Sequence, residues 1–197
     1  MENAVYLLAL VNPVSKILIL ASTRPSYTWS QITKISANAT VIAFVVLLAL
    51  VAAGNLILRN VFHVEIYSLQ IVGGLMLFLI GISAVTRGRF YHRNPLHDRM
   101  QISAVPMAIP LIVGPGTVVA AITFSGQLGL YRTMLALLIA LLANYFFMLG
   151  SIQLGRLFEK LHITEILIRI TGLIVASVAV QMILNAINIW VKSISNS

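Results

Sequence analysis

Two short proline motifs within apolar surroundings are the part of this sequence best suited to binding chemistry. Each has a small or polar residue before a proline and a hydroxyl residue two positions after it: Asn12, Pro13 and Ser15 in the first, Gly114, Pro115, Gly116 and Thr117 in the second. Proline lacks an N–H and clashes with the carbonyl four residues earlier, so it breaks or kinks a helix. In lipid, broken backbone must be buried in protein or line a polar cavity.

Such breaks expose groups that bind charged ligands. The N–H groups that begin a half-helix attract an anion, and unwound carbonyls hold a cation. The two motifs therefore predict a substrate site. A pair of purely structural kinks is the alternative, because proline is frequent in membrane helices.

Further polar residues inside apolar segments are candidates for gating or polar support: Lys16, Asn38, Thr123, Asn144 and Gln181. For Asn38, Asn144 and Gln181, the alternative is interhelical hydrogen bonding. Lys16 is the only charge well inside an apolar segment, which makes it a functional candidate. It also lies within about two turns of the segment's end, where its side chain could snorkel to the interface.

Residue types that are missing from the apolar segments limit the substrates and the chemistry that can be expected. All five acidic residues fall at segment ends or in loops: Glu2, Glu65, Asp98, Glu159 and Glu165. A cationic substrate normally needs a buried carboxylate, so a neutral, zwitterionic or anionic solute is expected. A coupling ion, sodium or proton, would have to use carbonyls and hydroxyls. There is no cysteine, and no HExxH, GxSxG, P-loop or GxGxxG motif, so we expect no enzyme, catalytic residue, cofactor or metal site.

The composition is that of a membrane protein. Of 197 residues, 59% are hydrophobic and 9% charged, and the mean hydropathy is +0.98; a soluble domain carries about 25% charged residues. The net charge of +8 comes from basic residues scattered in short loops. That placement suits anionic lipid headgroups and does not form the basic stripe of a nucleic-acid binder.

Six apolar segments predict an all-α membrane protein with six transmembrane helices. They cover residues 5–21, 35–58, 69–86, 104–125, 131–154 and 170–191, each of about membrane-spanning length. Nine basic residues fall in the loops of one side: Arg24, Lys34, Arg87, Arg89, Arg93, Arg99, Arg156, Lys160 and Arg169. Only Arg59, Arg132 and Lys192 fall on the other. The positive-inside rule then places both termini on the non-cytoplasmic side.

The chain reads as one membrane domain, residues 1–197, made of two related halves. Residues 1–86 form the first repeat, residues 87–103 a polar cytoplasmic loop, and residues 104–197 the second repeat. Pro13 and Pro115 are 102 positions apart, and Gly74 and Gly172 are 98 apart. Since each half has three spans, the halves insert with opposite orientation. This predicts two inverted three-helix repeats with helices 1 and 4 broken at prolines.

The stretch Pro106-Met107-Ala108-Ile109-Pro110-Leu111-Ile112-Val113-Gly114-Pro115-Gly116-Thr117 closely resembles the P-x-A-I-P-L-x-x-G-P-G-x signature of the MarC family. This family is also called UPF0056 or the small neutral amino acid transporter family. The resemblance covers essentially the whole chain. It implies a bacterial or archaeal cytoplasmic (inner) membrane protein, with the substrate held between the two breaks. The first helix departs from the family pattern, since Ser15 replaces a glycine and Leu18 a proline.

These observations predict a secondary transporter of small neutral amino acids similar to glycine and alanine. The substrate carboxylate is expected at the N–H groups near residues 114–117, and its ammonium at freed carbonyls and Asn12. The alternatives are a non-transporting membrane scaffold or regulator and a channel for small solutes. The bilayer and the amino acid are the expected partners. The oligomeric state and the direction of transport stay open.

Overall fold

The computed structural model describes residues 2–21, 27–61, 63–88 and 112–195, and every regular element in these ranges is a helix. In chain order these are α1 (Glu2–Val11), α2 (Pro13–Ala21), α3 (Trp29–Asn60), α4 (Ile66–Arg87), α6 (Pro115–Leu128), α7 (Leu130–Leu149), α8 (Ser151–Lys160) and α9 (Thr164–Ser195). The all-α prediction is confirmed.

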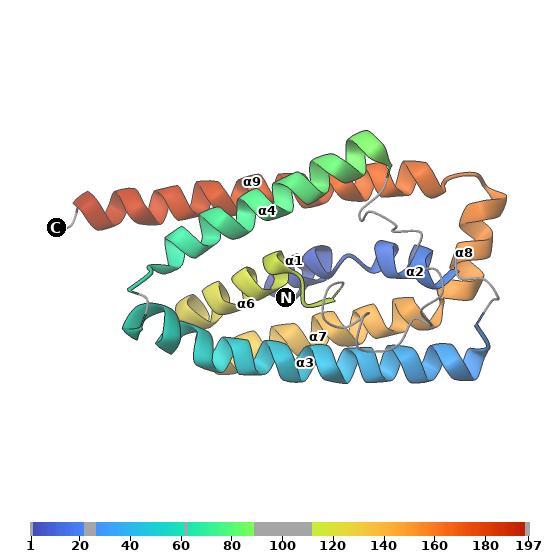
Figure 1. Ribbon diagram of the computed structural model, residues 1–197, viewed down its shortest axis with the longest axis horizontal. Coiled ribbons are helices and arrows are strands. Elements are labelled where there is room, and N and C mark those ends of the chain that lie inside the picture. The colour runs from blue at the N-terminus through green and yellow to red at the C-terminus, as the bar shows by residue number, and fades with distance from the viewer. Residues whose placement is uncertain (1, 22–26, 62, 89–111, 196–197) are drawn as a thin grey trace.

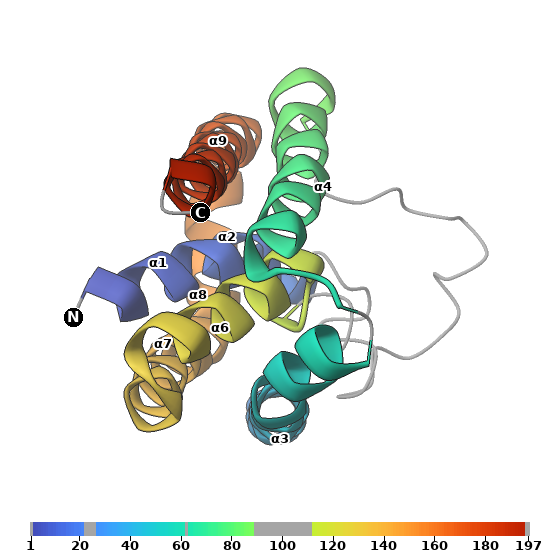
Figure 2. The same ribbon diagram turned by 90° about the vertical axis from the view of Figure 1, so that its left-hand side faces the viewer.

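The helices form three layers (Figures 1 and 2). The antiparallel pair α4 and α9 makes one outer layer, and α3 with α7 makes the other. Between them lie the short helices α1, α2 and α6, which contact both outer pairs. Both proline motifs are therefore held at the centre of the bundle, where broken backbone is shielded from lipid.

Five stretches of the described chain are long and apolar enough to cross a membrane: Asn3–Ala21, Trp29–Gly54, Ile66–Arg87, Leu130–Leu149 and Thr164–Ser195. The first consists of α1 and α2 in succession. The predicted fourth span, residues 104–125, lies partly outside the described residues. The helix that begins within it, α6, has 14 residues, which at 1.5 Å per residue is about 21 Å and shorter than the apolar core of a bilayer.

The predicted fifth segment, residues 131–154, was wrong at its end. Helix α7 stops at Leu149, and after Gly150 a separate helix, α8, crosses the end of the bundle (Figure 1). Glycine favours such a change of direction, because it costs more backbone entropy than other residues to hold in a helix. Polar and charged residues then dominate α8. It packs on α2 where Gly155 meets Ala21, so closely that a methyl group on Gly155 would overlap the Ala21 side chain.

The α4–α9 pair is also tied by polar contacts at that end of the bundle. Gly88 ends α4 in the left-handed conformation (φ 64°) and donates its N–H to the Ala84 carbonyl at 3.0 Å, as a glycine C-cap does. The Arg169 guanidinium of α9 donates to the Val85 carbonyl at 2.6 Å and pairs with Glu165 at 2.7 Å. The cation thus lies at the negative end of α4, where it is stabilising.

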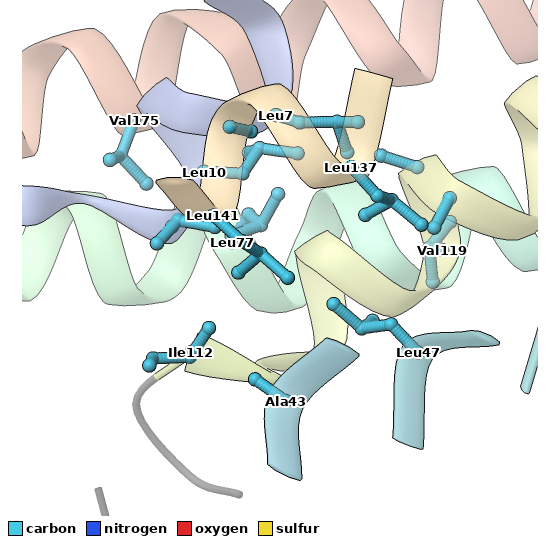
Figure 3. Close-up of a cluster of buried hydrophobic side chains, with 14 of the residues drawn as sticks. Leu7, Leu10, Ala43, Leu47, Leu77, Ile112, Val119, Leu137, Leu141 and Val175 are labelled. Atoms are coloured by element: carbon cyan, nitrogen blue, oxygen red, sulfur yellow. The ribbon is translucent and has the colours of Figure 1, made fainter. Parts of the chain in front are cut away.

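The core joins the layers through aliphatic side chains (Figure 3). Leu77 of α4 lies between side chains from α1, α7 and α9 and is 5% exposed. The outer surface is also apolar: Leu79, Phe146 and Leu173 are each at least 60% exposed. A protein with large apolar residues both inside and outside is built for a lipid surrounding, because water would disfavour such a surface.

Candidate substrate site between the broken helices

Asn12 separates α1 from α2 and stabilises both helix ends. Its backbone has φ 55°, a left-handed conformation that Asn tolerates better than most residues. Its N–H donates to the Leu8 carbonyl at 3.0 Å, which ends α1 as an αL cap. Its side-chain Oδ1 accepts the Ser15 N–H at 3.3 Å, which begins α2 as an N-cap with Pro13 in the first helical position. The Asn-Pro sequence therefore encodes the break.

Two side chains of α2 reach back to this break. The Ser15 hydroxyl donates to the Asn12 carbonyl at 2.8 Å. The Lys16 ammonium donates to the carbonyl of Val11, the last residue of α1. Lys16 is 1% exposed, so its charge does not snorkel to the interface. It interacts with the partial negative charge at the C-terminus of α1.

The second motif begins a helix. Gly114 is the N-cap of α6 with extended backbone, Pro115 follows in the first turn, and no side chain caps this end among the described residues. The first N–H to bond within the helix is that of Val118, which donates to the Gly114 carbonyl at 3.0 Å. Pro115 has no N–H, so Gly116 and Thr117 carry the N–H groups that precede the helix ladder.

A single small cavity joins the two motifs. It offers about 30 Å³ to the centres of water molecules, enough for about two waters. Its lining comes from α1, the break, α2, α4, α6 and α9: Leu10, Asn12, Ser15, Lys16, Leu77, Ile80, Gly114, Pro115, Gly116, Thr117 and Val175. From it α2 and α6 run in opposite directions (Figure 1). Two helix N-termini thus converge on one cavity with both polar and apolar walls.

The charge of the lining is positive. No acidic side chain is among the described residues that border the cavity, and Lys16 is its one ionisable group. The Thr117 side chain is 2% exposed, and no hydrogen bond of its hydroxyl joins it to another described residue. Uncapped N–H groups, a buried ammonium and a free hydroxyl are together an arrangement that binds an anionic group.

Gly116 allows the layers to close over the cavity. A methyl group built on Gly116 would lie within 2.5 Å of three Leu77 side-chain atoms. The α6 backbone therefore approaches α4 as closely as a glycine permits. Any larger residue would separate α6 from α4 at the point where the N–H groups of Gly116 and Thr117 are presented.

The sequence-predicted residues fall into two groups. All the predicted substrate-binding residues except Pro13 border the cavity, and so does Lys16. Of the other predicted supporting residues, Thr123 and Asn144 are buried away from the cavity, while Asn38 and Gln181 lie on exposed faces. The Asn144 amide donates to the Met148 sulfur at 3.2 Å, and Gln181 donates to Asn185 at 2.9 Å. Both contacts join residues four positions apart within one helix, so neither is the interhelical bond that was the alternative for these amides.

Sequence reasoning did not identify the apolar part of the lining, Leu10, Leu77, Ile80 and Val175. An apolar residue in an apolar helix carries no signal of its own. The repeat offers one: Leu77 plus the 98-residue offset of Gly74 and Gly172 gives position 175. Under the predicted repeat Leu77 would correspond to Val175, and both residues border the cavity.

Fold and site together define an integral membrane protein whose central layer holds a small cavity between interrupted helices. The chain belongs to the MarC family of integral membrane proteins, whose sequence profile it matches over residues 1–191. The resemblance in the fourth segment is thereby confirmed. No solved structure matches the chain.

Similar proteins occur in archaea and bacteria. A UPF0056 membrane protein of Pyrococcus horikoshii is 30% identical over 184 residues, covering 93% of this chain and 91% of that protein. The UPF0056 membrane protein YvbG of Bacillus subtilis is 30% identical, covering 90% and 88%. The UPF0056 inner membrane protein YhgN of Escherichia coli is 29% identical, covering 96% of each chain.

Proposed function

We propose that this protein is a secondary transporter of small neutral amino acids of the glycine and alanine type across the cytoplasmic membrane. The observation that carries the proposal is the convergence of two half-helix N-termini on one small, acid-free cavity in the central layer. Interrupted helices with their N-termini at an anionic substrate group are characteristic of secondary transporters. The size of the cavity supports a small substrate.

In this proposal, the carboxylate of the amino acid accepts hydrogen bonds from the N–H groups of Gly116 and Thr117. Its ammonium binds the side-chain oxygen of Asn12 at the opposite wall. The carbonyl of Val11 is not available for this, since Lys16 already donates to it. Leu77 and Val175 limit the side chain by their bulk, which favours glycine and alanine over larger residues.

Transport by this route requires alternating access. The cavity is small and lies between closely packed helices. In this proposal substrate entry requires α6 to move away from α4.

Contacts between the outer helices support the inverted-repeat architecture. Two glycine contacts occur where α4 crosses α9. The 98-residue offset between the two halves relates one contact to the other. A methyl group on Gly74 would lie 3.0 Å from the Ala179 carbonyl oxygen, and one on Gly172 would lie 3.0 Å from that of Gly81. Here 74 + 98 = 172 and 179 − 98 = 81, so the first contact maps onto the second. Such reciprocity is expected of two halves related by a two-fold axis in the membrane plane.

The charge distribution supports an orientation with α8 in the cytoplasm. The end of the bundle that carries α8 also carries most basic residues of the described chain: Lys34, Arg87, Arg156, Lys160 and Arg169. The opposite end has Arg132 and Lys192. By the positive-inside rule the α8 end is cytoplasmic, and the C-terminus faces outward.

Counterflow in proteoliposomes tests the proposal. Vesicles loaded with unlabelled alanine should transiently accumulate external radiolabelled alanine, and excess glycine should suppress the signal. Repeating the assay with sodium and proton gradients would identify the coupling ion. Folded protein that shows no exchange with any of a panel of neutral amino acids would refute the transporter proposal, and non-saturating flux would indicate a channel.

A further inference from the structure

We infer that the carboxylate of the ligand accounts for most of its binding in the cavity, that Lys16 is the positively charged partner of this carboxylate, and that small monocarboxylates lacking an ammonium group are therefore ligands too. This inference rests on the proposed function insofar as it places the ligand in the same cavity. It goes beyond it by assigning a further ligand class and a specificity-determining residue.

The first argument is the environment of Lys16. Its side chain is 1% exposed and borders the cavity, and its ammonium donates to a backbone carbonyl. No carboxylate of the described chain pairs with it; the ion pair in these ranges joins Arg169 and Glu165 at exposed positions near one end of the bundle. A buried ammonium has three donors, and one carbonyl only partly compensates its charge. An anion in the adjacent cavity would supply a full counter-charge.

The second argument is the net charge that the helix ends contribute around the cavity. The N-termini of α2 and α6 both border the cavity, and each adds partial positive charge. The partial negative end nearby, that of α1, is already bonded to Lys16. The cavity therefore has an excess of positive charge that a monocarboxylate would neutralise. A zwitterion would bring its own ammonium into this positive field, so its second charge adds little to binding.

The third argument concerns geometry. Lys16 lies one turn into α2, and its side chain runs back toward the helix N-terminus, as helical side chains do. This direction brings the ammonium to the break, the same place that α6 faces with the N–H groups of Gly116 and Thr117. Thr117 also borders the cavity, and its hydroxyl can add a neutral donor. One carboxylate can thus accept from both sides of the cavity.

The test compares alanine with its two truncated forms. Propionate is alanine without the ammonium, and ethylamine is alanine without the carboxylate. Direct binding of radiolabelled propionate to the purified full-length protein in detergent should be saturable. Unlabelled alanine should displace it, and ethylamine at the same concentration should not.

Two variants then measure how much the positive charge of Lys16 contributes to propionate binding. Lys16→Met keeps the length of the side chain and removes the ammonium, and should weaken propionate binding by about 10- to 100-fold, the value of a hydrogen bond to a charged group. Lys16→Arg keeps the charge and should retain most of the affinity. Thermal melting of both variants shows whether they are folded.

The outcomes separate this inference from the proposed function. Alanine counterflow without any propionate binding would overturn the inference and leave the transporter proposal standing. Propionate binding without alanine exchange would support the inference and remove the amino acid assignment. Displacement by ethylamine as effective as by alanine, or equal propionate affinity in folded Lys16→Met and the wild type, would also overturn the inference.

Discussion

Replacing Gly116 by alanine tests how closely α6 must approach α4 for the site to form. The added methyl group would lie within 2.5 Å of three atoms of the Leu77 side chain. Ordinary carbon–carbon contacts are about 3.5–4.0 Å, so α6 must move by about 1 Å or Leu77 must leave its place. Leu77 is 5% exposed and packed among the side chains of the core, so it cannot simply rotate away.

The cost of this overlap follows from core overpacking, about 1–3 kcal/mol. For a protein of this size, that corresponds to a fall in melting temperature of about 2–12 °C. The effect on the site should be larger than on stability, because the N–H groups of Gly116 and Thr117 move with α6. Losing a hydrogen bond to a charged group weakens binding by about 10-fold or more.

The assay is thermal melting in detergent together with alanine counterflow. Gly150→Ala is the matched control: its methyl group would lie 3.3 Å from the flexible end of Leu154 and at an ordinary 3.7 Å from the Phe147 carbonyl oxygen, and its φ of −73° is ordinary for alanine. Gly116→Ala combined with Leu77→Ala should be more stable than the two single changes predict, since the second change removes the clashing atoms. If Gly116→Ala matches the wild type in melting and exchange, the reasoning about this contact is wrong.

Three further changes follow from the structure. Asn12→Ala should lower stability by about 1–3 kcal/mol, because it removes an N-cap and places alanine at φ 55°, whereas Asn12→Gly should cost less; equal melting temperatures of the two variants would refute this account of the break. Thr123→Val should be neutral or stabilising by up to about 1 kcal/mol, since the buried Thr123 hydroxyl has no partner in the described chain; a melting temperature well below the wild type would show that this hydroxyl is bonded. Gly81→Ala should lower the melting temperature more than either, because its methyl group would lie 2.7 Å from the Ala176 backbone nitrogen; an unchanged melt would mean that α4 and α9 are not held this close.

The break in the first helix could be predicted from the sequence because its cause is local. Pro13 removes an N–H, and Asn12 accepts a left-handed backbone and caps the next helix, so two neighbouring residues determine the geometry. The same holds for the start of α6 at Gly114 and Pro115. The helical structure of the long apolar segments could also be predicted from the sequence, because a chain in lipid has few alternatives to a helix.

The end of α7 could not be predicted in this way. Two apolar residues, Ile152 and Leu154, still follow Gly150 among polar ones, and a glycine inside an apolar run is often tolerated in membrane helices. The turn into α8 depends on the contact between Gly155 and Ala21, residues far apart in the chain. Sequence periodicity does not contain that information.

The position of Lys16 also depends on tertiary structure. One turn from the break, the side chain could have reached either the interface or the interior. The structure directs it to the Val11 carbonyl. Asn38 and Gln181 show the converse: their chemistry made them candidates, yet their faces of α3 and α9 point away from the cavity. Which face of a helix is buried depends on its neighbours, and an apolar helix has little amphipathic pattern to reveal it.

The most direct test of the central claim is the amide signal of Gly116 during substrate titration. Pro115-Gly116 is the only Pro-Gly pair in the sequence, so labelling proline carbonyl carbon and glycine nitrogen yields one assigned correlation in an NMR spectrum. Adding alanine should shift this signal saturably, at the concentrations that saturate counterflow. A signal that stays in place while alanine exchange saturates would show that the substrate binds elsewhere and would contradict the assignment of this cavity.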